Sequence, residues 1–402
     1  MPLVSDTSSK GFGPSMHPGE CVRYICDELY SIEIGEIMNA MQVNGKQPLE
    51  YALAACDTMM RRFAPETLPP VGRFHYHQGV FLSGVYETYR LSGERRLLDY
   101  LKAWVDSIID EYGDISNFNP GQLDDLEPGN LLFPLYKETG DERYKLAMDT
   151  ILWFYERFPK NSLGGFWHNC MGRDQMWLDG LYMAGPFIAQ YAREFKRPEL
   201  QDVVVHQAGL MEKLTRDPKT GLWYHAVDLR KRHEWANPET GCSPEFWGRA
   251  MGWVPVALLN IMDCVDDRHR ETLARITRNL LLALIPFQDA ETGLWYEVTD
   301  KGGQPGNWLE TSCSCLYAAA ICKAVRVGRL PKTTLNAAWK AASGVISRLK
   351  TEGGDLLIQD ICEGTWIGDY DFYVGRKRCT NDLHGVGAFL LMCAEAERTF
   401  NR

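Results

Sequence analysis

One carboxylate of this chain lies in an unusually apolar stretch. In the segment 176–187, MWLDGLYMAGPF, Asp179 is flanked by methionine, tryptophan, leucine and tyrosine. Burial among apolar side chains raises the pKa of a carboxyl group, and a second carboxylate nearby raises it further. A helix N-terminus at this place would lower the pKa instead, and the sequence alone does not decide between these effects. A carboxyl group poised near neutral pH serves as general acid and general base, so we predict that Asp179 is catalytic.

A second carboxylate is available in the segment 121–132, GQLDDLEPGNLL. Asp124 and Asp125 are adjacent there, and either one could be the partner that raises the pKa of Asp179. The sequence leaves the choice between them open.

Aromatic and polar residues gather in the same segments as the Gly turns, a combination that is typical of sugar binding. Aromatic faces stack on pyranose rings, while polar groups take the hydroxyls. Arg249, in SPEFWGRAMGW (243–253), could pair bidentately with a substrate carboxylate or form an internal salt bridge. The polar candidates for the pocket are Asp124, Asp125, His168, Asp179, His225, Arg249 and His384.

The elements that must position these residues are predicted to be helices. Segments such as 96–112 and 270–287 carry apolar residues at i, i+3, i+4 and i+7. Helical hairpins recur about every 50 to 75 residues, and a Gly-aromatic loop recurs in DPKTGLWYHAVD (217–228) and DAETGLWYEVTD (289–300). A degenerate copy is SLGGFWHN (162–169). Six hairpins would use about 67 residues each, so we predict an all-α fold, an (α/α)6 barrel with one deep cavity.

Composition excludes several classes of partner. The net charge of −10 disfavours a nucleic-acid or membrane-surface partner, and no apolar run is long enough to cross a membrane. The first 20 residues lack an apolar signal region and are predicted to be a loose segment of a single catalytic domain, 1–402. Scattered cysteines without metal-site spacing suggest reduced core residues and a cytoplasmic location. The sequence does not define the oligomeric state, and a monomer is compatible with it.

Several motifs together resemble glycoside hydrolase family 105, the unsaturated rhamnogalacturonyl hydrolases. They are MWLDGLYMAGPF, GLWYHAVD, SPEFWGRAMGW, LDDLEPGNLLFPLYKETGDERY and NDLHGVGAFLL, and the resemblance runs from about residue 74 to residue 397. It implies an (α/α)6 barrel that cleaves a Δ4,5-unsaturated uronic acid from the non-reducing end of a short sugar, without a metal or organic cofactor. The family's catalytic aspartate falls on Asp179 and its second aspartate on Asp124. Substrate-contacting positions fall on His168, His225, Trp247, Arg249 and Trp253, while Met251 replaces an asparagine that family members often have.

The implied chemistry needs a proton donor. Protonation of the enol ether at C4 gives an oxocarbenium ion at C5, water adds there, and the hemiketal opens to expel the neighbouring sugar. On this interpretation Asp179 is protonated before the reaction, and Asp124 either keeps the pKa of Asp179 high or orients water. Arg249 or His225 holds the substrate carboxylate.

Three other functions remain open at this point. An unsaturated glucuronyl hydrolase acting on glycosaminoglycan or ulvan fragments would use the same residues. A sugar epimerase on the same barrel would use two histidines, such as His225 and His384, as its acid and base. A non-catalytic sugar-binding protein would keep the tryptophans and tolerate the loss of the Asp179 carboxylate.

Overall fold

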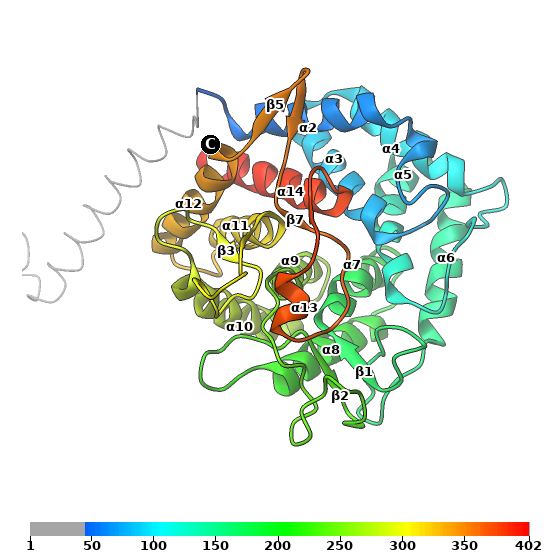
Figure 1. The fold of residues 1–402 in the computed structure, drawn as a ribbon. Helices are drawn as coiled ribbons and strands as arrows, with labels where there is room; N and C mark the ends of the chain where they lie inside the picture. The colour runs from blue at the N-terminus through cyan, green and yellow to red at the C-terminus, as the bar shows by residue number, and fades with distance from the viewer. Residues whose placement is uncertain (1–44, 402) are drawn as a thin grey trace, which may run out of the picture. The chain divides into compact units, whose positions relative to one another are not determined.

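The computed structural model describes residues 45–401, and these residues form a ring of helices two layers deep (Figure 1). The predicted loose segment, 1–20, lies outside the described residues. The inner layer consists of α3 (Tyr76–Ser92), η3 (Glu127–Leu131) continued by α5 (Leu132–Thr139), α7 (Leu178–Glu194), α9 (Gly248–Met262), α11 (Thr311–Arg326) and α14 (Leu383–Phe400). The outer layer consists of α2 (Pro48–Arg62), α4 (Arg95–Ile108), α6 (Glu142–Glu156), α8 (Glu199–Thr215), α10 (Asp267–Leu284) and α12 (Leu335–Ser347).

The inner helices contact one another in a closed circle. Each packs against the next one along the chain, and α14 packs against α3 to complete the ring. Five outer helices pair with the inner helix that precedes them, whereas α2 pairs with α14 from the other end of the described chain. The predicted all-α (α/α)6 barrel is therefore confirmed, and its sixth hairpin is assembled from both ends of the described part.

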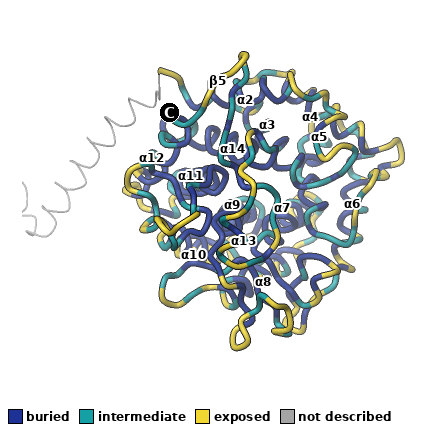
Figure 2. The backbone as a smooth tube through the Cα atoms, viewed as in Figure 1, coloured by how far each residue is buried: buried dark blue, intermediate teal, exposed yellow. Residues whose placement is uncertain are grey.

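Burial separates the two layers as hydrophobic periodicity requires. The inner helices α9 and α11 are buried on nearly all sides, while α4 and α10 alternate buried and exposed positions (Figure 2). At the closing contact, a Cβ atom added to Gly387 of α14 would lie 2.4 Å from the backbone oxygen of Val80 in α3. Only glycine therefore lets these two helices approach so closely. No helix among the described residues is long and apolar enough to cross a membrane.

Short hairpins and turns connect the helices. Within residues 45–401 four antiparallel pairs form: β1 (Gln175–Trp177) with β2 (Ala226–Asp228), β3 (Trp295–Tyr296) with β4 (Leu309–Glu310), β5 (Lys350–Glu352) with β6 (Asp355–Leu357), and β7 (Ile361–Cys362) with β8 (Arg378–Cys379). The remaining short helices are η1 (Pro65–Thr67), η2 (Leu123–Asp125), η4 (Ile285–Phe287), η5 (Lys332–Thr334) and α13 (Tyr370–Val374). Except for η5, which joins the end of α11 to the start of α12 at the other end of the ring, these elements lie where the inner helices begin, the end that holds the site described below.

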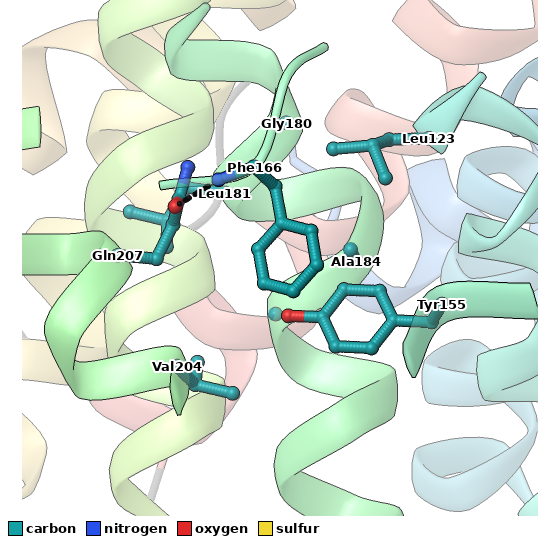
Figure 3. A pocket seen from close by; sticks show the side chains of 9 residues that line it. Leu123, Tyr155, Phe166, Gly180, Leu181, Ala184, Val204 and Gln207 are labelled. Atoms are coloured by element: carbon teal, nitrogen blue, oxygen red, sulfur yellow. Dashed lines mark hydrogen bonds between the residues drawn. The ribbon is translucent and has the colours of Figure 1, made fainter. Parts of the chain in front are cut away.

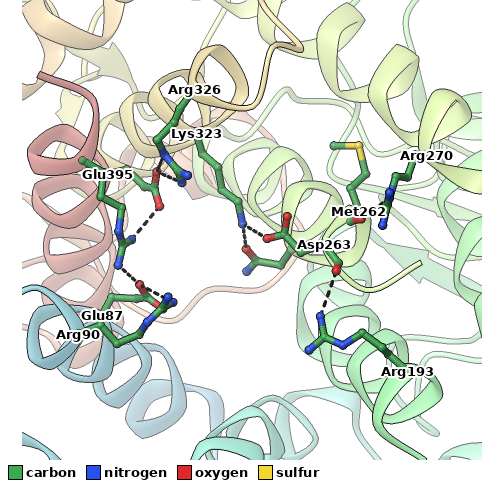
Figure 4. A network of polar contacts seen from close by, with 11 residues as sticks. Glu87, Arg90, Arg193, Met262, Asp263, Arg270, Lys323, Arg326 and Glu395 are labelled. Atoms are coloured by element: carbon green, nitrogen blue, oxygen red, sulfur yellow. Dashed lines mark hydrogen bonds and ion pairs between the residues drawn. The ribbon is translucent and has the colours of Figure 1, made fainter. Parts of the chain in front are cut away.

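The opposite end of the ring, where the inner helices finish, is bridged by charged side chains (Figure 4). Arg398 pairs with both Glu87 and Glu395, and Lys323 pairs with Asp263 at 2.7 Å. A cavity of about 820 Å³ lies at this end. Its ion pairs link helices that are far apart in sequence and so help to hold the ring closed.

Candidate active site

Three related loops position the first residues of successive inner elements. A backbone N–H at the start of each inner element donates to the carbonyl of a loop residue: Leu123 to His168 at 3.1 Å, Leu178 to His225 at 3.0 Å, and Gly248 to Glu297 at 2.8 Å. The acceptors occupy matching positions of the Gly-aromatic loops that the sequence repeats. The residue that follows each donor therefore has an equivalent place in the ring. These three residues are Asp124, Asp179 and Arg249.

The three residues line one cavity of about 400 Å³ at this end of the ring. Of the residues that the sequence predicted for the site, Asp124, Asp179, His168, Trp247, Arg249 and Trp253 line it. The other lining residues are Tyr76, Asn119, Gly121, Gln122, Asn169, Cys170, Met171, Trp177, Met183, Thr365 and Trp366. His225, Asp125 and His384 lie outside this lining.

The electrostatics of Asp179 differ from our expectation. Burial raises the pKa of its carboxyl group, but the contact with His225, whose Nε2 lies 3.0 Å from Oδ2, outweighs burial and leaves the pKa below its usual value. The Tyr373 hydroxyl lies 2.7 Å from Nδ1 of His225 and can donate to it, which directs the Nε2 proton toward Asp179. The prediction that apolar neighbours keep Asp179 protonated is therefore wrong for the free protein.

Asp124, rather than Asp179, has the raised carboxyl pKa that was expected of Asp179. Burial is the main cause, and the charges of Asp179 and Asp125 add to it, so the pKa of Asp124 rises to about 8. The nearest side-chain donor is distant, because Nε2 of His168 lies 3.5 Å from Oδ1. Burial also lowers the pKa of His168 to about 4, so this ring is neutral. At neutral pH the two cavity carboxyls thus differ, with Asp124 protonated and Asp179 ionised.

Asp125 does not line the cavity, and its predicted role in substrate binding stays a prediction. Its fully buried carboxylate accepts from the backbone N–H of Asn119 at 2.8 Å and from the Gln122 amide at 2.5 Å, and it lies 3.7 Å from the Arg73 guanidinium. Asp125 therefore holds the loop that precedes η2. Asp124, rather than Asp125, is therefore the carboxyl group that shares the cavity with Asp179, because adjacent residues of this 3₁₀ turn point their side chains in different directions.

His384 also lies apart from the cavity lining, at the start of α14. Its Nε2 is 3.0 Å from the Cys362 carbonyl and its Nδ1 is 2.9 Å from Asp382. His384, Asp382 and His77 form the one group of three or more such side chains among residues 45–401 whose donor atoms are close enough to hold a metal ion. The predicted contact of His384 with a substrate therefore stays a prediction, and the residue does not line the cavity.

Arg249 brings a fixed positive charge to the cavity. Its guanidinium donates to the carbonyls of Cys362 at 2.5 Å and Glu363 at 2.7 Å, and it lies 4.5 Å from the centre of the Trp247 ring. The nearest acceptors are neutral carbonyls, and within residues 45–401 the guanidinium makes no close ion pair, so the internal salt bridge considered above is not formed. The charges of Glu310 and Glu297 raise its pKa and keep it positive where it lines the cavity.

Aromatic rings form one wall of the cavity. Trp177 stacks on His168 with ring centroids 4.2 Å apart and meets Trp366 edge-on at 4.6 Å. Trp253 packs on Tyr182 at 4.5 Å. Trp177, Trp366 and Tyr373 were not predicted as site residues. The first two belong to the aromatic set that the sequence shows, whereas nothing in the sequence indicates that Tyr373 would reach His225.

The cavity lies where the inner helices begin. Tyr76, Asp179 and Arg249 stand in the first turns of α3, α7 and α9, so the unpaired N–H groups of these helices and their positive dipole ends face the same space. Such a site favours an anionic ligand. Asp179 is stabilised in its ionised form by the same arrangement.

Packing behind Asp179 is dense. A small void beside this helix start has a volume of about 10 Å³, and Leu123, Tyr155 and Phe166 are among the residues that line it (Figure 3). Such a volume is at the lower limit for one water molecule. The Phe166 backbone N–H donates to the Gln207 side chain at 3.0 Å, which fixes the loop that carries His168. Met251 is also buried here, under Trp223, and does not line the cavity.

A closed ring of helical hairpins with a cavity that holds two carboxyls and aromatic walls defines a helical-barrel glycosidase. Residues 51–400 match the model of Glycosyl Hydrolase Family 88, and the chain belongs to this family. A solved glycoside hydrolase of family 105 from C. acetobutylicum ATCC 824 is 33% identical, with a TM-score of 0.82 over 87% of this chain and 99% of that chain. The predicted resemblance to family 105 is thereby confirmed.

Two further relatives define the range of similarity. The unsaturated rhamnogalacturonyl hydrolase YesR of Bacillus subtilis strain 168 is 28% identical over 60% of this chain and 68% of its own length. The unsaturated glucuronyl hydrolase of Bacillus sp. GL1 is 16% identical, with a TM-score of 0.66 over 88% of this chain and 96% of that chain. At this identity the second relative shows a common fold only.

Proposed function

We propose that this glycosidase releases a Δ4,5-unsaturated galacturonic acid from the non-reducing end of rhamnogalacturonan-derived oligosaccharides. The similarity to YesR supports the choice of substrate. The observation that carries the reaction class is the pair of carboxyls on one cavity, Asp124 with a pKa of about 8 and Asp179 with a lowered pKa. Carboxyl pairs whose environments separate their pKa values divide acid and base roles.

The pair supplies one proton at neutral pH and takes one back. A proton passes to C4 of the enol ether, which generates an oxocarbenium ion at C5. Water then adds at C5 and returns a proton to the pair, and the hemiketal opens to release the next sugar. In this proposal the proton rests on Asp124 in the free protein, and Asp179 is the ionised partner that stabilises the developing positive charge. This assignment replaces the single protonated Asp179 of the sequence analysis.

Other residues of the cavity position the sugar. Arg249 and the first turns of the inner helices are proposed to attract the uronate carboxylate, since both present positive charge to the cavity. Trp177, Trp366 and Trp253 are proposed to stack on sugar rings. His225 is proposed to act through Asp179 rather than on the sugar, because its ring is fully buried.

The finer assignments of domain and location are proposals as well. We propose that the chain is one catalytic domain that acts in the cytoplasm on imported oligosaccharides. The cysteines of the described residues are all free, which suits a reducing compartment. Cell fractionation with an antibody against the protein tests this location.

The decisive experiment compares two substrates in one assay. The protein is incubated with Δ4,5-unsaturated galacturonyl-rhamnose or with an unsaturated glucuronyl disaccharide, and loss of the enol-ether ultraviolet absorbance is followed. We expect turnover of the galacturonyl compound and a loss of about 100-fold to 10,000-fold in Asp179→Asn and in Asp124→Asn. No turnover of either compound would refute the hydrolase, and preference for the glucuronyl compound would refute the substrate.

A further inference from the structure

A group of three side chains beside the cavity has the donor set of a metal site. His77 lies in the first turn of α3, and Asp382 and His384 lie at the start of α14, next to it in the ring. One atom of each lies within 4.8 Å of the others. Nδ1 of His384 is 2.9 Å and Nε2 of His77 is 3.8 Å from Oδ1 of Asp382. None of the three lines the cavity, so the proposed hydrolysis leaves them without a role.

The hydrogen bonding of His384 leaves a lone pair facing this group. A carbonyl oxygen only accepts, so the contact of Nε2 with Cys362 at 3.0 Å places the ring proton on Nε2. In the neutral ring Nδ1 then carries the lone pair, and in that state this buried atom has no hydrogen-bond donor facing it among the described residues. It faces a carboxylate oxygen of Asp382 at 2.9 Å. Two electron-rich atoms at this distance repel each other unless a positive charge lies between them, either a proton on Nδ1, which makes an ion pair that lowers the pKa of Asp382, or a metal ion.

We propose that His77, Asp382 and His384 bind one divalent transition-metal ion of the zinc type. Two imidazoles and one carboxylate form a common ligand set for such ions. With ligand atoms about 2.1 Å from the ion, the separations of 2.9 and 3.8 Å correspond to angles of about 90° and 130°. The bond from His384 to Cys362 is the outer contact that orients metal-binding histidines in proteins. His77 and Asp382 are partly exposed, which leaves open coordination positions.

The site is connected to the active-site carboxyl through His75. Nδ1 of His77 lies 3.0 Å from Nδ1 of His75, and Nε2 of His75 lies 4.0 Å from Oδ2 of Asp124. A metal ion on Nε2 of His77 places the ring proton on Nδ1, which then donates to His75. The remaining proton of His75 lies on the nitrogen that faces Asp124. The bound ion thus fixes the orientation of a donor toward Asp124.

Metal binding is measured directly, so the test does not depend on the proposed function. The full chain, freed of any histidine tag, is stripped with a chelator and titrated with Zn²⁺ by calorimetry, and bound zinc is counted by mass spectrometry after gel filtration. We expect one Zn²⁺ per chain and an affinity that falls about 100-fold or more in His77→Gln and Asp382→Asn. His233→Gln is the matched control, because His233 is exposed and far along the chain from this group.

A second measurement covers the case in which a variant fails to fold. Co²⁺ replaces Zn²⁺ in the wild-type protein, and its visible absorption reports nitrogen and oxygen ligands without any substitution. Stoichiometric binding with such a spectrum supports the site. The proposal would be overturned if the wild-type protein bound no Zn²⁺ at about 100 µM, which is 100 times a micromolar dissociation constant. It would also be overturned if folded His77→Gln bound Zn²⁺ as tightly as the wild-type protein does. The first of these results would mean that a proton, in a His384–Asp382 ion pair, occupies the gap.

Discussion

The contact between His225 and Asp179 gives a prediction about pH dependence. Burial raises the pKa of Asp179, and the neighbouring His225 opposes this rise most strongly. Replacing His225 by phenylalanine keeps a ring in the buried space but removes the Nε2 donor at 3.0 Å. A hydrogen bond to a charged group contributes about 1.5–3 kcal/mol, and one pKa unit corresponds to about 1.4 kcal/mol. The pKa of Asp179 should therefore rise by about 1–2 units.

The proposed reaction translates this shift into a rate profile. Activity needs Asp179 ionised and Asp124 protonated, so kcat/KM should follow a bell whose acid limb reports Asp179 and whose alkaline limb lies near pH 8. In His225→Phe the acid limb should move up by about 1–2 pH units, while the alkaline limb stays near its position. The measurement is the initial rate of absorbance loss between pH 4 and pH 10.

Two matched variants identify the cause of such a shift. His225→Gln keeps an amide donor near Asp179 and should move the acid limb less than His225→Phe does. Tyr373→Phe removes only the hydroxyl that lies 2.7 Å from Nδ1 of His225, and it should cause a smaller change still. An acid limb that stays in place in folded His225→Phe, or moves to lower pH, would refute the reasoning.

Three other predictions concern stability and binding. Glu127 is buried with Oε2 unpartnered, and its pKa in the folded state lies well above 4.5. The free energy of unfolding should therefore fall as pH rises above the pKa of the unfolded state, by up to about 2.7 kcal/mol between pH 6 and pH 8. Glu127→Gln should abolish this fall, and denaturant unfolding at both pH values measures it. An equal pH dependence in both proteins would contradict this. Gly387→Ala should destabilise the ring by about 1–3 kcal/mol, because its Cβ would lie 2.4 Å from the Val80 oxygen, whereas Gly209→Ala, with open space around its Cβ, should not. Trp366→Ala should raise KM about tenfold with kcat nearly unchanged, since the half-exposed ring lies on the cavity wall; a fall in kcat alone would argue against a binding role.

The sequence predicted those features that depend on local pattern. Helical periodicity identified both layers, because an outer helix such as α10 carries one apolar face and an inner helix such as α9 is apolar on nearly all sides. The repeated Gly-aromatic loops were recognised as equivalent, and the structure shows that His168, His225 and Glu297 hold successive inner elements by the same backbone hydrogen bond. Aligning these loops more closely would have placed Asp124, rather than Asp125, in the position equivalent to Asp179.

The features that the sequence could not give depend on contacts between distant segments. Tyr373 reaches His225 from α13, and His384 approaches His77 because α14 closes the ring against α3. The orientation of Asp125 depends on a single step along a 3₁₀ turn. The contacts of Tyr373 and His384 have no signature in the local pattern, because each joins segments that are far apart in the sequence.

The reversed pKa values of Asp179 and Asp124 follow from their backbone positions as much as from burial. Both carboxyls are largely shielded from solvent, but Asp179 lies in the first turn of a helix of 17 residues and has His225 beside it. Asp124 belongs to a three-residue 3₁₀ turn, and Nε2 of His168 is 3.5 Å from its Oδ1. Apolar neighbours in the sequence therefore cannot identify the protonated carboxyl. Burial and the neighbouring charges of Asp179 and Asp125 keep Asp124 protonated, whereas the contact with His225 outweighs burial and keeps Asp179 ionised.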